Sequence, residues 1–379
     1  MKICLIGPTY PFRGGIAHYT TLLYRYLRKK HDVVFISFKK QYPRLLFPGR
    51  TDRDSSNKHI QENGVLPMID PMNPFTWLKS VRNMMKTKPD LVILPWWASF
   101  WAFPFWTITS LIRFFSRSKV LFLCHNVVEH EPTWISKKLA RLVLKRGDFF
   151  IVHSAEDQSK LLDMLPDAKV TKTFHPTYDV FNFGDADPQR IRSKYGLKRN
   201  IILFFGFIRS YKGLEYLIRS LPDVLSKMEV SLLVVGEFWK RKDEYLRLIK
   251  GLKLEKNIIL VDEYVPNEEV GDYFSASDLV VQPYVEGTGS GVIQIAYGFN
   301  KPVIATKVGC LPEVIEDGKT GYLVPPESPH ELARAIIKFF RNGNSEEFSK
   351  NIRVENAKFS WDRLVENIED LAFPKHSLQ

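Results

Sequence analysis

The sequence predicts an α/β protein made of two doubly wound, Rossmann-like domains that face each other across a cleft. Short apolar runs alternate with longer amphipathic runs along the chain, as expected for parallel sheets covered by helices on both faces. The alternation occurs in two series, separated by a polar, acidic stretch at residues 178–196. The length of 379 residues is long for one core and suits two.

The first series predicts strands within KICLIG, DVVFISF, DLVIL, KVLFLCHN and FFIVHS, and the second within NIILFFGFI, VSLLVVGE, NIILVDEYV, DLVVQPY and PVIAT. We therefore place one domain at residues 1–177 and another at residues 178–357. Residues 358–379 are expected to form a helix that packs back across the joint. Doubly wound sheets bind ligands at the carboxyl ends of their strands, so we expect the site in the crevice between the domains.

The charge is unevenly distributed along the chain. Residues 1–175 contain 27 Lys and Arg against 13 Asp and Glu, a net of +14, whereas the remaining residues contain 27 against 29, a net of −2. Solvated helix faces explain runs of cations but not a one-sided excess. We expect an anionic partner for the first half, either a membrane surface or a phosphorylated acceptor. No recognition motif for nucleic acid accompanies the charge, which argues against that partner.

The stretch LVILPWWASFWAFPFWTITSLI, residues 91–112, has no charged residue and reaches the length of a membrane span. Pro95, Pro104 and the strand within DLVIL argue against a span. An interfacial face and a helix buried in protein both stay open. We expect Trp96, Trp97 and Trp101 on an acceptor or membrane face, because basic residues follow in RFFSRSK. MKICLIG runs directly into a strand, so the cytoplasm is the expected compartment, with peripheral contact at the inner membrane face.

Two loops of the second half have the composition of a phosphate site. In GFIRSYKG, Gly206 ends a strand, and Arg209 and Lys212 precede a helix, where a planar guanidinium and a point charge suit a diphosphate. In VEGTGSGV, Glu286 precedes a run of small residues at another helix start, where bare N–H groups favour an anion. The residues of this run that we assign to the donor are Thr288, Gly289, Ser290, Gly291 and Val292.

The first half contributes a second group of candidates. Gly14 and Gly15 follow the first strand at a helix start, without the G-x-G-x-x-G of NAD enzymes. They let the backbone approach a ligand closely, and we assign them to donor binding. His125 and Asn126 end a later strand, where side chains reach the ligand. His130 and Glu131 follow them, but no third ligand is found and we expect no metal site. The Asp185-Ala186-Asp187 sequence lies between the two series and is interpreted as an acidic linker.

The run from GFIRSYKG through VVGE and SDLVVQPY to GTGSGVIQIAYGFNKPVIATKVGCLPEVIEDGKTGYLVPP resembles the donor domain of family 4 retaining glycosyltransferases, which have the GT-B fold. The paired glycines after the first strand and the HN sequence resemble that family's acceptor domain. The resemblance implies a nucleotide-diphosphate sugar bound by the second domain, an acceptor bound by the first, and no cofactor or catalytic metal. It also implies that Glu237 of VVGE lies among the donor-binding residues.

The same resemblance implies a role for each charged residue. Arg209 and Lys212 match the pair that binds the diphosphate, and His125 matches the histidine near the donor sugar. Retaining members are assigned a front-face mechanism in which the departing diphosphate accepts the proton of the incoming hydroxyl. On that basis Arg209 and Lys212 stabilise the charge of the leaving group.

The E-x7-E pair of the family is absent. If Glu286 is the first member, the second position is Gln294, whereas alignment on KPVIAT places the pair at Gly287 and Ile295. Cys310 also replaces a usual glycine. We therefore expect a retaining glycosyltransferase acting on a glycan, a polysaccharide precursor or a lipid-linked acceptor. The alternative is a catalytically weak sugar-nucleotide-binding subunit that supports a partner glycosyltransferase. The nucleotide, sugar, acceptor and linkage do not follow from the sequence.

Overall fold

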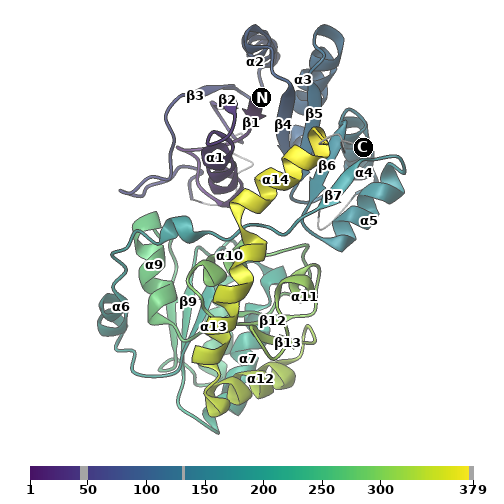
Figure 1. The fold of residues 1–379 in the computed structure, drawn as a ribbon. Coiled ribbons are helices and arrows are strands. Elements are labelled where there is room, and N and C mark those ends of the chain that lie inside the picture. The colour runs from purple at the N-terminus through teal and green to yellow at the C-terminus, as the bar shows by residue number, and fades with distance from the viewer. Residues whose placement is uncertain (43–49, 130–132, 375–379) are drawn as a thin grey trace. The chain divides into compact units, whose positions relative to one another are not determined.

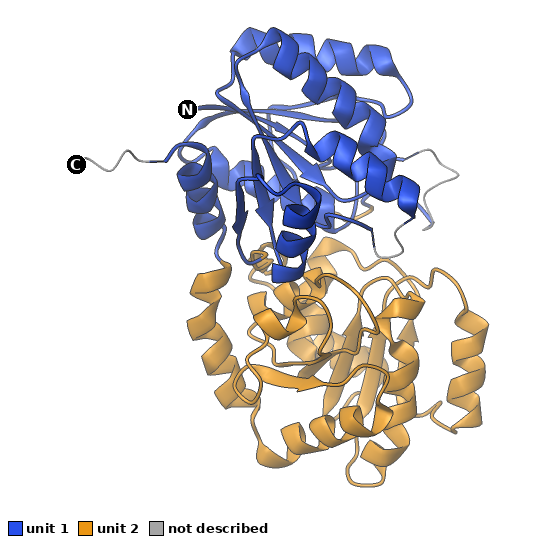
Figure 2. Cartoon of the chain, turned by 90° about the vertical axis from the view of Figure 1, so that its right-hand side faces the viewer, with its two compact units in different colours: residues 1–54, 59–174, 360–379 blue, residues 55–58, 175–359 orange. Residues whose placement is uncertain are grey.

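The computed structural model describes residues 1–42, 50–129 and 133–374, and the chain divides into two compact units (Figure 2). Unit 1 comprises residues 1–54, 59–174 and 360–379, and unit 2 comprises residues 55–58 and 175–359. Each unit is a parallel sheet with helices, so the predicted fold class is confirmed. The predicted divisions lie after residues 177 and 357, and the observed ones after residues 174 and 359.

Unit 1 is built on a seven-stranded parallel sheet in the order β3-β2-β1-β4-β5-β6-β7 (Figure 1). The strands are apolar runs, and the inner ones are almost completely buried because helices cover both faces. The strands are β1 (Lys2–Ile6), β2 (Asp32–Phe38), β3 (Val65–Ile69), β4 (Leu91–Trp96), β5 (Lys119–Cys124), β6 (Phe149–Val152) and β7 (Val170–Lys172).

Three helices of unit 1 begin at residues whose side chains satisfy an N–H group of the first turn. Asn73 Oδ1, the Thr133 hydroxyl and the Ser154 hydroxyl each accept a hydrogen bond from the first turn of the following helix. The helices are α1 (Gly15–Leu27), α2 (Pro74–Thr87), η1 (Ser99–Trp101), α3 (Ala102–Phe115), α4 (Trp134–Leu144), α5 (Ala155–Met164) and α14 (Trp361–Ala372).

The C-terminal helix α14 packs against α1 within unit 1. The Trp361 ring lies 4.9 Å from the Tyr19 ring, centroid to centroid, and His31 Nε2 lies 2.8 Å from a Glu369 carboxylate oxygen. The two ends of the chain therefore build one core, and the predicted terminal helix is part of the first unit.

Unit 2 has a six-stranded parallel sheet in the order β10-β9-β8-β11-β12-β13. Its strands are β8 (Ile201–Phe205), β9 (Ser231–Val235), β10 (Ile258–Val261), β11 (Leu279–Gln282), β12 (Val303–Thr306) and β13 (Gly321–Val324). Its helices are η2 (Asp179–Phe181), α6 (Pro188–Tyr195), η3 (Ser210–Lys212), α7 (Leu214–Leu225), α8 (Lys242–Gly251), α9 (Asn267–Ala276), α10 (Gly291–Gly298), α11 (Leu311–Val314), α12 (Pro329–Asn342), α13 (Ser345–Glu355) and η4 (Asn356–Phe359).

Residues 55–58 belong to unit 2 although they lie early in the chain. The Glu268 carboxylate accepts hydrogen bonds from the N–H groups of Asn57 and Lys58, at 2.9 and 3.2 Å, and the Ser56 hydroxyl accepts one from the N–H of Asn267 at 2.8 Å. The short segment therefore binds the start of α9, where a helix leaves N–H groups without partners.

The tryptophans expected on a membrane face lie in the core of unit 1, and this corrects the prediction. Trp96, Trp97 and Trp101 are all buried. Trp96 Nε1 donates to the Val127 carbonyl at 3.2 Å, and the Trp101 ring stacks 4.2 Å from the Phe38 ring. The uncharged segment contains β4, which lies in the middle of the sheet between β1 and β5, so its apolar character serves protein burial. Within the described ranges, no helix combines the length and apolar composition that crossing a bilayer needs.

Replacement of Trp101 by Ala tests this placement. A buried indole in a packed core contributes to stability through contacts that Ala cannot replace, so we expect the free energy of unfolding to fall by about 3–5 kcal/mol. Phe103→Ala is the matched control, because Phe103 is 65% exposed on the same segment, and it should change stability by less than about 0.5 kcal/mol. Urea denaturation measures both values, and a Trp101 variant as stable as the Phe103 variant would contradict the core assignment.

Candidate active site

The loop that follows β8 brings Lys212 back to the strand end. Gly206, with φ +94°, has the backbone conformation that glycine favours, and a Cβ at this position would lie 3.0 Å from Lys212 Nζ. Gly213, with φ +69°, allows the loop to pass directly over the end of β11, since a Cβ there would lie 1.9 Å from the Pro283 carbonyl oxygen. The two glycines therefore fix Lys212 at the carboxyl ends of β8 and β11.

The ammonium group of Lys212 is buried without a compensating carboxylate. Burial, with repulsion from Arg209 as a smaller cause, lowers the pKa of Lys212 to about 8. Its Nζ lies 5.8 Å from the centre of the Tyr284 ring. In the described part of the chain, no carboxylate forms an ion pair with Lys212 or with Arg209. A buried cation in this state favours the binding of an anion.

Arg209 is held by aromatic rings. Its guanidinium carbon lies 4.0 Å from the centre of the Trp239 ring and 5.0 Å from that of Tyr211. Cation–π contact of this kind orients the planar guanidinium, and the Tyr211 side chain also forms a hydrogen bond with it. Trp239 and Tyr211 were not among the predicted site residues, although Tyr211 lies between the two predicted cations in the sequence.

The predicted glycine-rich loop ends at a helix start beside Lys212. Ser290 caps α10, its hydroxyl accepting a hydrogen bond from the N–H of Ile293 at 3.4 Å, and the same hydroxyl lies 2.9 Å from the Tyr284 hydroxyl. A Cβ on Gly206 would lie 3.3 Å from Val292 Cγ2, so the first turn of α10 adjoins the Lys212 loop. The partial positive charge of this helix end adds to the two cations.

The loop after β12 packs against residues 287–289. The Cys310 N–H donates to the Thr288 carbonyl at 2.9 Å, and Gly309, with φ +50°, leaves no room for a Cβ against the Gly287 carbonyl. A Cβ on Gly289 would lie 3.1 Å from Cys310 Sγ. The unusual cysteine therefore fills space beside the smallest residue of the loop. Thr288 is buried, whereas Gly289 and Gly291 are exposed.

Glu286 is exposed and its charge acts on Tyr211. The pKa of Tyr211 is raised mainly by burial, is lowered by Arg209, and is raised further by Glu286. Gln294, at the other predicted glutamate position, is buried with its Oε1 atom lacking a hydrogen-bond partner among the described residues. Glu286 therefore lies on the Tyr211 side of the site, and Gln294, eight positions beyond it, offers a neutral amide.

Glu237 and the predicted linker aspartates are held in the framework of unit 2. Glu237 is buried, and its carbonyl accepts a hydrogen bond from the N–H of Ile208 at 2.9 Å. Asp185 forms an ion pair with Lys58, while the Asp187 carboxylate caps α6 by accepting from the N–H of Gln189 at 2.9 Å. The D-x-D sequence therefore has structural partners.

In unit 1, His125 follows β5 and lies in a cluster of rings. The Tyr19 ring meets the His125 ring edge-on at 4.6 Å, and the Tyr19 hydroxyl lies 3.1 Å from His153 Nε2. His153 Nδ1 lies 3.0 Å from the Thr173 carbonyl, which requires the proton on Nδ1 and leaves Nε2 to accept from Tyr19. Burial lowers the pKa of His153 to about 4, opposed by the Thr173 hydrogen bond, so this ring is neutral at pH 7.

The two predicted glycines of unit 1 lie at the start of α1. Gly14, with φ +104°, precedes the helix, and neither Gly14 nor Gly15 has an atom within 4 Å of where a Cβ would stand. His18 donates its N–H to the Gly14 carbonyl at 3.1 Å, and burial lowers its pKa to about 4, opposed by Asp54. Asn126 is half-buried beside His125. His130 and Glu131 lie outside the described residues.

His18, Tyr19 and His153 were not predicted as part of this group. The signal for the first two was present, since GGIAHY places them one turn after the glycines. His153 ends β6, the neighbour of the strand that carries His125, and the same strand-end argument applied to FFIVHS would have found it.

The chain matches two family models. Residues 13–179 match "Glycosyltransferase Family 4" and residues 187–357 match "Glycosyl transferases group 1". The chain belongs to the family 4, group 1 glycosyltransferases. This confirms the resemblance predicted from the sequence.

Curated relatives match about half to two thirds of the chain. Spore coat protein SA of Bacillus subtilis is 28% identical over 52% of this chain and 54% of its own length. Alpha-D-kanosaminyltransferase of Streptomyces kanamyceticus is 26% identical over 59% of this chain and 55% of its own. The chain thus spans little more than half the length of these two relatives.

Solved structures share the fold over the whole chain. Anabaena Alr3699/HepE in complex with UDP has a TM-score of 0.73 at 17% identity, over 98% of this chain and 99% of that chain. Sucrose-phosphate synthase of Thermosynechococcus elongatus has a TM-score of 0.71 at 18% identity, over 98% of each. These similarities support the GT-B fold.

Replacement of Lys212 by Met should stabilise the protein in the absence of ligand. A pKa lowered from 10.5 to about 8 means that keeping the ammonium protonated costs folding up to about 3 kcal/mol at pH 7. Met has a similar shape and no charge, so we expect the free energy of unfolding at pH 7 to rise by about 1–3 kcal/mol.

The sign of the pH dependence provides a second measurement. Between about pH 8 and 10.5 the unfolded chain retains the Lys212 proton and the folded protein has lost it, so stability rises with pH in that window. The variant should lack this contribution. Urea denaturation at pH 7 and within the window from about pH 8 to 10.5 measures both effects, with the exposed Lys227→Met as control. A Lys212→Met variant that behaves like this control would contradict the assignment.

Proposed function

We propose that the protein is a retaining, metal-independent glycosyltransferase that uses a nucleotide-diphosphate sugar. The observation that carries the proposal is the convergence of Lys212, Arg209 and the start of α10 at the strand ends of unit 2, with no carboxylate among the described residues paired to either cation. Two positive groups and a helix N-terminus together match the charge of a diphosphate. Related structures support this donor class, since Anabaena Alr3699/HepE has been solved with UDP and with UDP-glucose.

In the proposed reaction the bond between the sugar C1 and the diphosphate oxygen breaks, and a bond between C1 and an acceptor hydroxyl oxygen forms on the same face of the sugar. The hydroxyl proton passes to the departing diphosphate oxygen. Lys212 and Arg209 stabilise the negative charge that develops on that oxygen, which is an electrostatic contribution made without movement of the protein. Glu286 is assigned to the hydroxyls of the donor sugar, and His125 to the reacting end of the sugar.

The acceptor in this proposal is a glycan, a polysaccharide precursor or a lipid-linked sugar bound by unit 1. Gly14 and Gly15 of unit 1 are assigned to the donor, because the backbone there leaves space for a ligand to approach. We also propose a cytoplasmic protein in peripheral contact with the inner membrane face. The net charge of +14 on residues 1–175 supports that contact, although the buried tryptophans no longer do.

The alternative, a sugar-nucleotide-binding subunit with little activity of its own, is favoured by one observation. The second glutamate of the family is replaced, by Gln294 or by Ile295 according to the alignment. Hydrolysis of nucleotide sugars by the purified chain distinguishes the two functions. A transferase releases nucleotide diphosphate slowly without acceptor and with EDTA in place of Mg²⁺, whereas a binding subunit releases none.

Binding of a nucleoside diphosphate should depend on pH through Lys212. The ammonium is half protonated at about pH 8 and loses its charge as the pH rises further, so the affinity for UDP, ADP or GDP should fall as pH rises through 8. A charge-assisted hydrogen bond contributes about 1.5–3 kcal/mol, which predicts a tenfold to hundredfold loss. Calorimetric titration from pH 6.5 to 9.5 measures it.

Two variants complete that test. Lys212→Met should bind weakly at every pH and show no change near pH 8. Glu286→Gln should bind the nucleoside diphosphate as the native protein does and lose transfer activity, since its proposed contact is with the sugar. A native affinity that is flat from pH 6.5 to 9.5 would contradict the proposed role of Lys212.

His125→Ala should lower the rate of transfer more than the affinity for the donor. The imidazole is assigned to the reacting sugar, and contacts made in the transition state reduce kcat when they are lost. We expect a decrease in kcat of at least about tenfold with KM for the donor changed by less than about threefold. His153→Gln serves as a comparison, because it keeps a hydrogen-bond acceptor for Tyr19 and should retain most activity. Unchanged kcat in His125→Ala would show a structural histidine.

A further inference from the structure

Three helices of unit 1 carry positive charge and no negative charge. Helices α2, α3 and α4 pack side by side in this order, α2 against α3 and α3 against α4 (Figure 1). Together they contain seven Lys and Arg and no Asp or Glu: Lys79, Arg82, Lys86, Arg113, Lys137, Lys138 and Arg141. We call the solvent side of these helices the basic layer.

Most of these cations have no anionic partner within the described residues. Arg113 alone of the seven forms an ion pair, with Asp148 at 3.5 Å. Several helices of unit 2 carry compensated cations, since Arg219, Arg334 and Lys350 each pair with a glutamate on their own helix. The positive charge of the basic layer is therefore left uncompensated, in contrast to an ordinary solvated helix face.

The basic layer also exposes large apolar side chains. Of the twelve large apolar residues that are strongly exposed in the described chain, eight lie on these three helices: Phe75, Leu78, Phe103, Phe114, Phe115, Trp134, Ile135 and Leu142. Phe75 is 80% exposed and Phe114 81%, so neither contributes to the core. A concentration of exposed aromatic and aliphatic groups on one layer is typical of an interaction surface.

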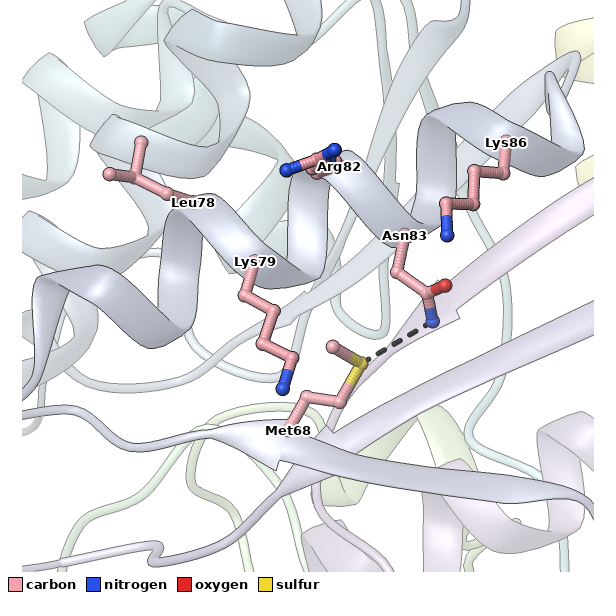
Figure 3. A pocket seen from close by; sticks show the side chains of 6 residues that line it. All are labelled: Met68, Leu78, Lys79, Arg82, Asn83 and Lys86. Carbon is pink, nitrogen blue, oxygen red and sulfur yellow. Dashed lines mark hydrogen bonds between the residues drawn. The ribbon is translucent and has the colours of Figure 1, made fainter.

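A groove at the edge of the layer combines the same two properties. It has a volume of about 550 Å³ and lies between α2 and β3 (Figure 3). Its lining consists of Met68, Leu78, Lys79, Arg82, Asn83 and Lys86. The Lys79 and Asn83 side chains extend toward Met68, with Asn83 Nδ2 3.5 Å from the Met68 sulfur. Three cations and an amide around one opening, with no acidic residue in the lining, favour a phosphate group.

We propose that the basic layer is the surface by which the protein docks on an anionic phospholipid leaflet, with a lipid phosphate in the α2–β3 groove. The inference deepens the peripheral membrane contact proposed above and does not depend on the donor site. Basic side chains attract the leaflet, and exposed rings such as Phe114 and Trp134 enter the interface between headgroups and acyl chains. Long Lys and Arg side chains keep their charges at headgroup level while those rings are buried.

The chemistry of the layer favours lipid over a protein or nucleic-acid partner. Protein–protein interfaces are depleted of lysine, whereas four of the seven cations of the layer are lysines. A nucleic-acid surface would leave the flat faces of its aromatic rings open for stacking on bases, whereas Lys138 Nζ lies over the Trp134 ring, 4.7 Å from its centre. Here the most exposed pair, Phe114 and Phe115, contact each other edge-on at 4.7 Å and form one apolar projection. Such a projection suits a fluid apolar phase.

The test is co-sedimentation of the full-length protein with vesicles, without nucleotide sugar. Binding should be strong with phosphatidylglycerol and phosphatidylcholine mixtures, weak with phosphatidylcholine alone, and reduced by salt. Lys137→Glu, Lys138→Glu and Arg141→Glu together should reduce partitioning at least about hundredfold, because each basic residue near an anionic leaflet strengthens it about fivefold. The matched control reverses three exposed cations of unit 2 and changes the net charge equally: Lys227→Glu, Lys250→Glu and Lys256→Glu.

A second pair of variants tests the apolar contribution. Phe114→Ser and Phe115→Ser together should reduce vesicle binding about tenfold or more, while Leu246→Ser and Val354→Ser, exposed residues of unit 2, should not. Nucleoside diphosphate binding is measured on every variant and should stay at the native level, which separates this proposal from the one on the donor site. Three results would overturn the proposal. One is an equal loss of vesicle binding in the layer and control variants, and another is binding without preference for anionic lipid. The third is binding to a DNA duplex in place of vesicles.

Discussion

The burial of one unpaired ammonium group is the constraint around which the site of unit 2 is built. Lys212 lies where the parallel strands β8 and β11 end, and the chain reaches it only because Gly206 and Gly213 adopt positive φ values and have no Cβ. A larger residue at either glycine would displace the lysine or the Pro283 backbone. Burial of the Lys212 ammonium therefore makes the folded protein less stable, and a bound anion would offset that cost. The same buried charge accounts for the geometry of the site and for the class of ligand proposed for it.

The residues around Lys212 contact the two cations without neutralising their charge. Tyr284 hydrogen-bonds with Ser290 and presents its ring to the ammonium, and the rings of Trp239 and Tyr211 hold Arg209 without neutralising it. A carboxylate in any of these places would pair with a cation and compete with the ligand. Glu286 acts on Tyr211 through its charge, and its side chain is exposed. The loss of the second family glutamate to Gln294 or Ile295 is consistent with a site that keeps its anions few.

Sequence patterns were sufficient for the fold and for the loops of unit 2, because both depend on local rules. Alternating apolar runs specify parallel strands, and glycine with Lys or Arg at a strand end specifies an anion loop. The patterns failed where the deciding contact is between distant residues. The position of Trp101 depends on Phe38, and the group around His125 depends on Tyr19, His153 and the C-terminal Trp361. An uncharged run signals burial, but it does not say whether protein or lipid provides the apolar surroundings.

The corrected position of the tryptophans changes the meaning of the charge asymmetry. In the sequence, the positive charge of residues 1–175 lies next to the uncharged aromatic segment. In the fold, seven of these cations lie on α2, α3 and α4. Each of these helices buries Val, Met, Phe or Ile side chains on the sheet and exposes Phe, Trp or Leu side chains among its cations. Because apolar and charged residues alternate along each helix, these helices do not stand out as apolar stretches in the sequence. Uncompensated charge persists on a surface only if the free protein tolerates the self-repulsion. Among the described residues, six cations without an ion pair lie on α2 and α4, the two helices on either side of α3, and they make that repulsion substantial. Unit 2 shows the same principle on a smaller scale, because within its described residues Lys212 and Arg209 have no carboxylate partner at the site proposed for an anion.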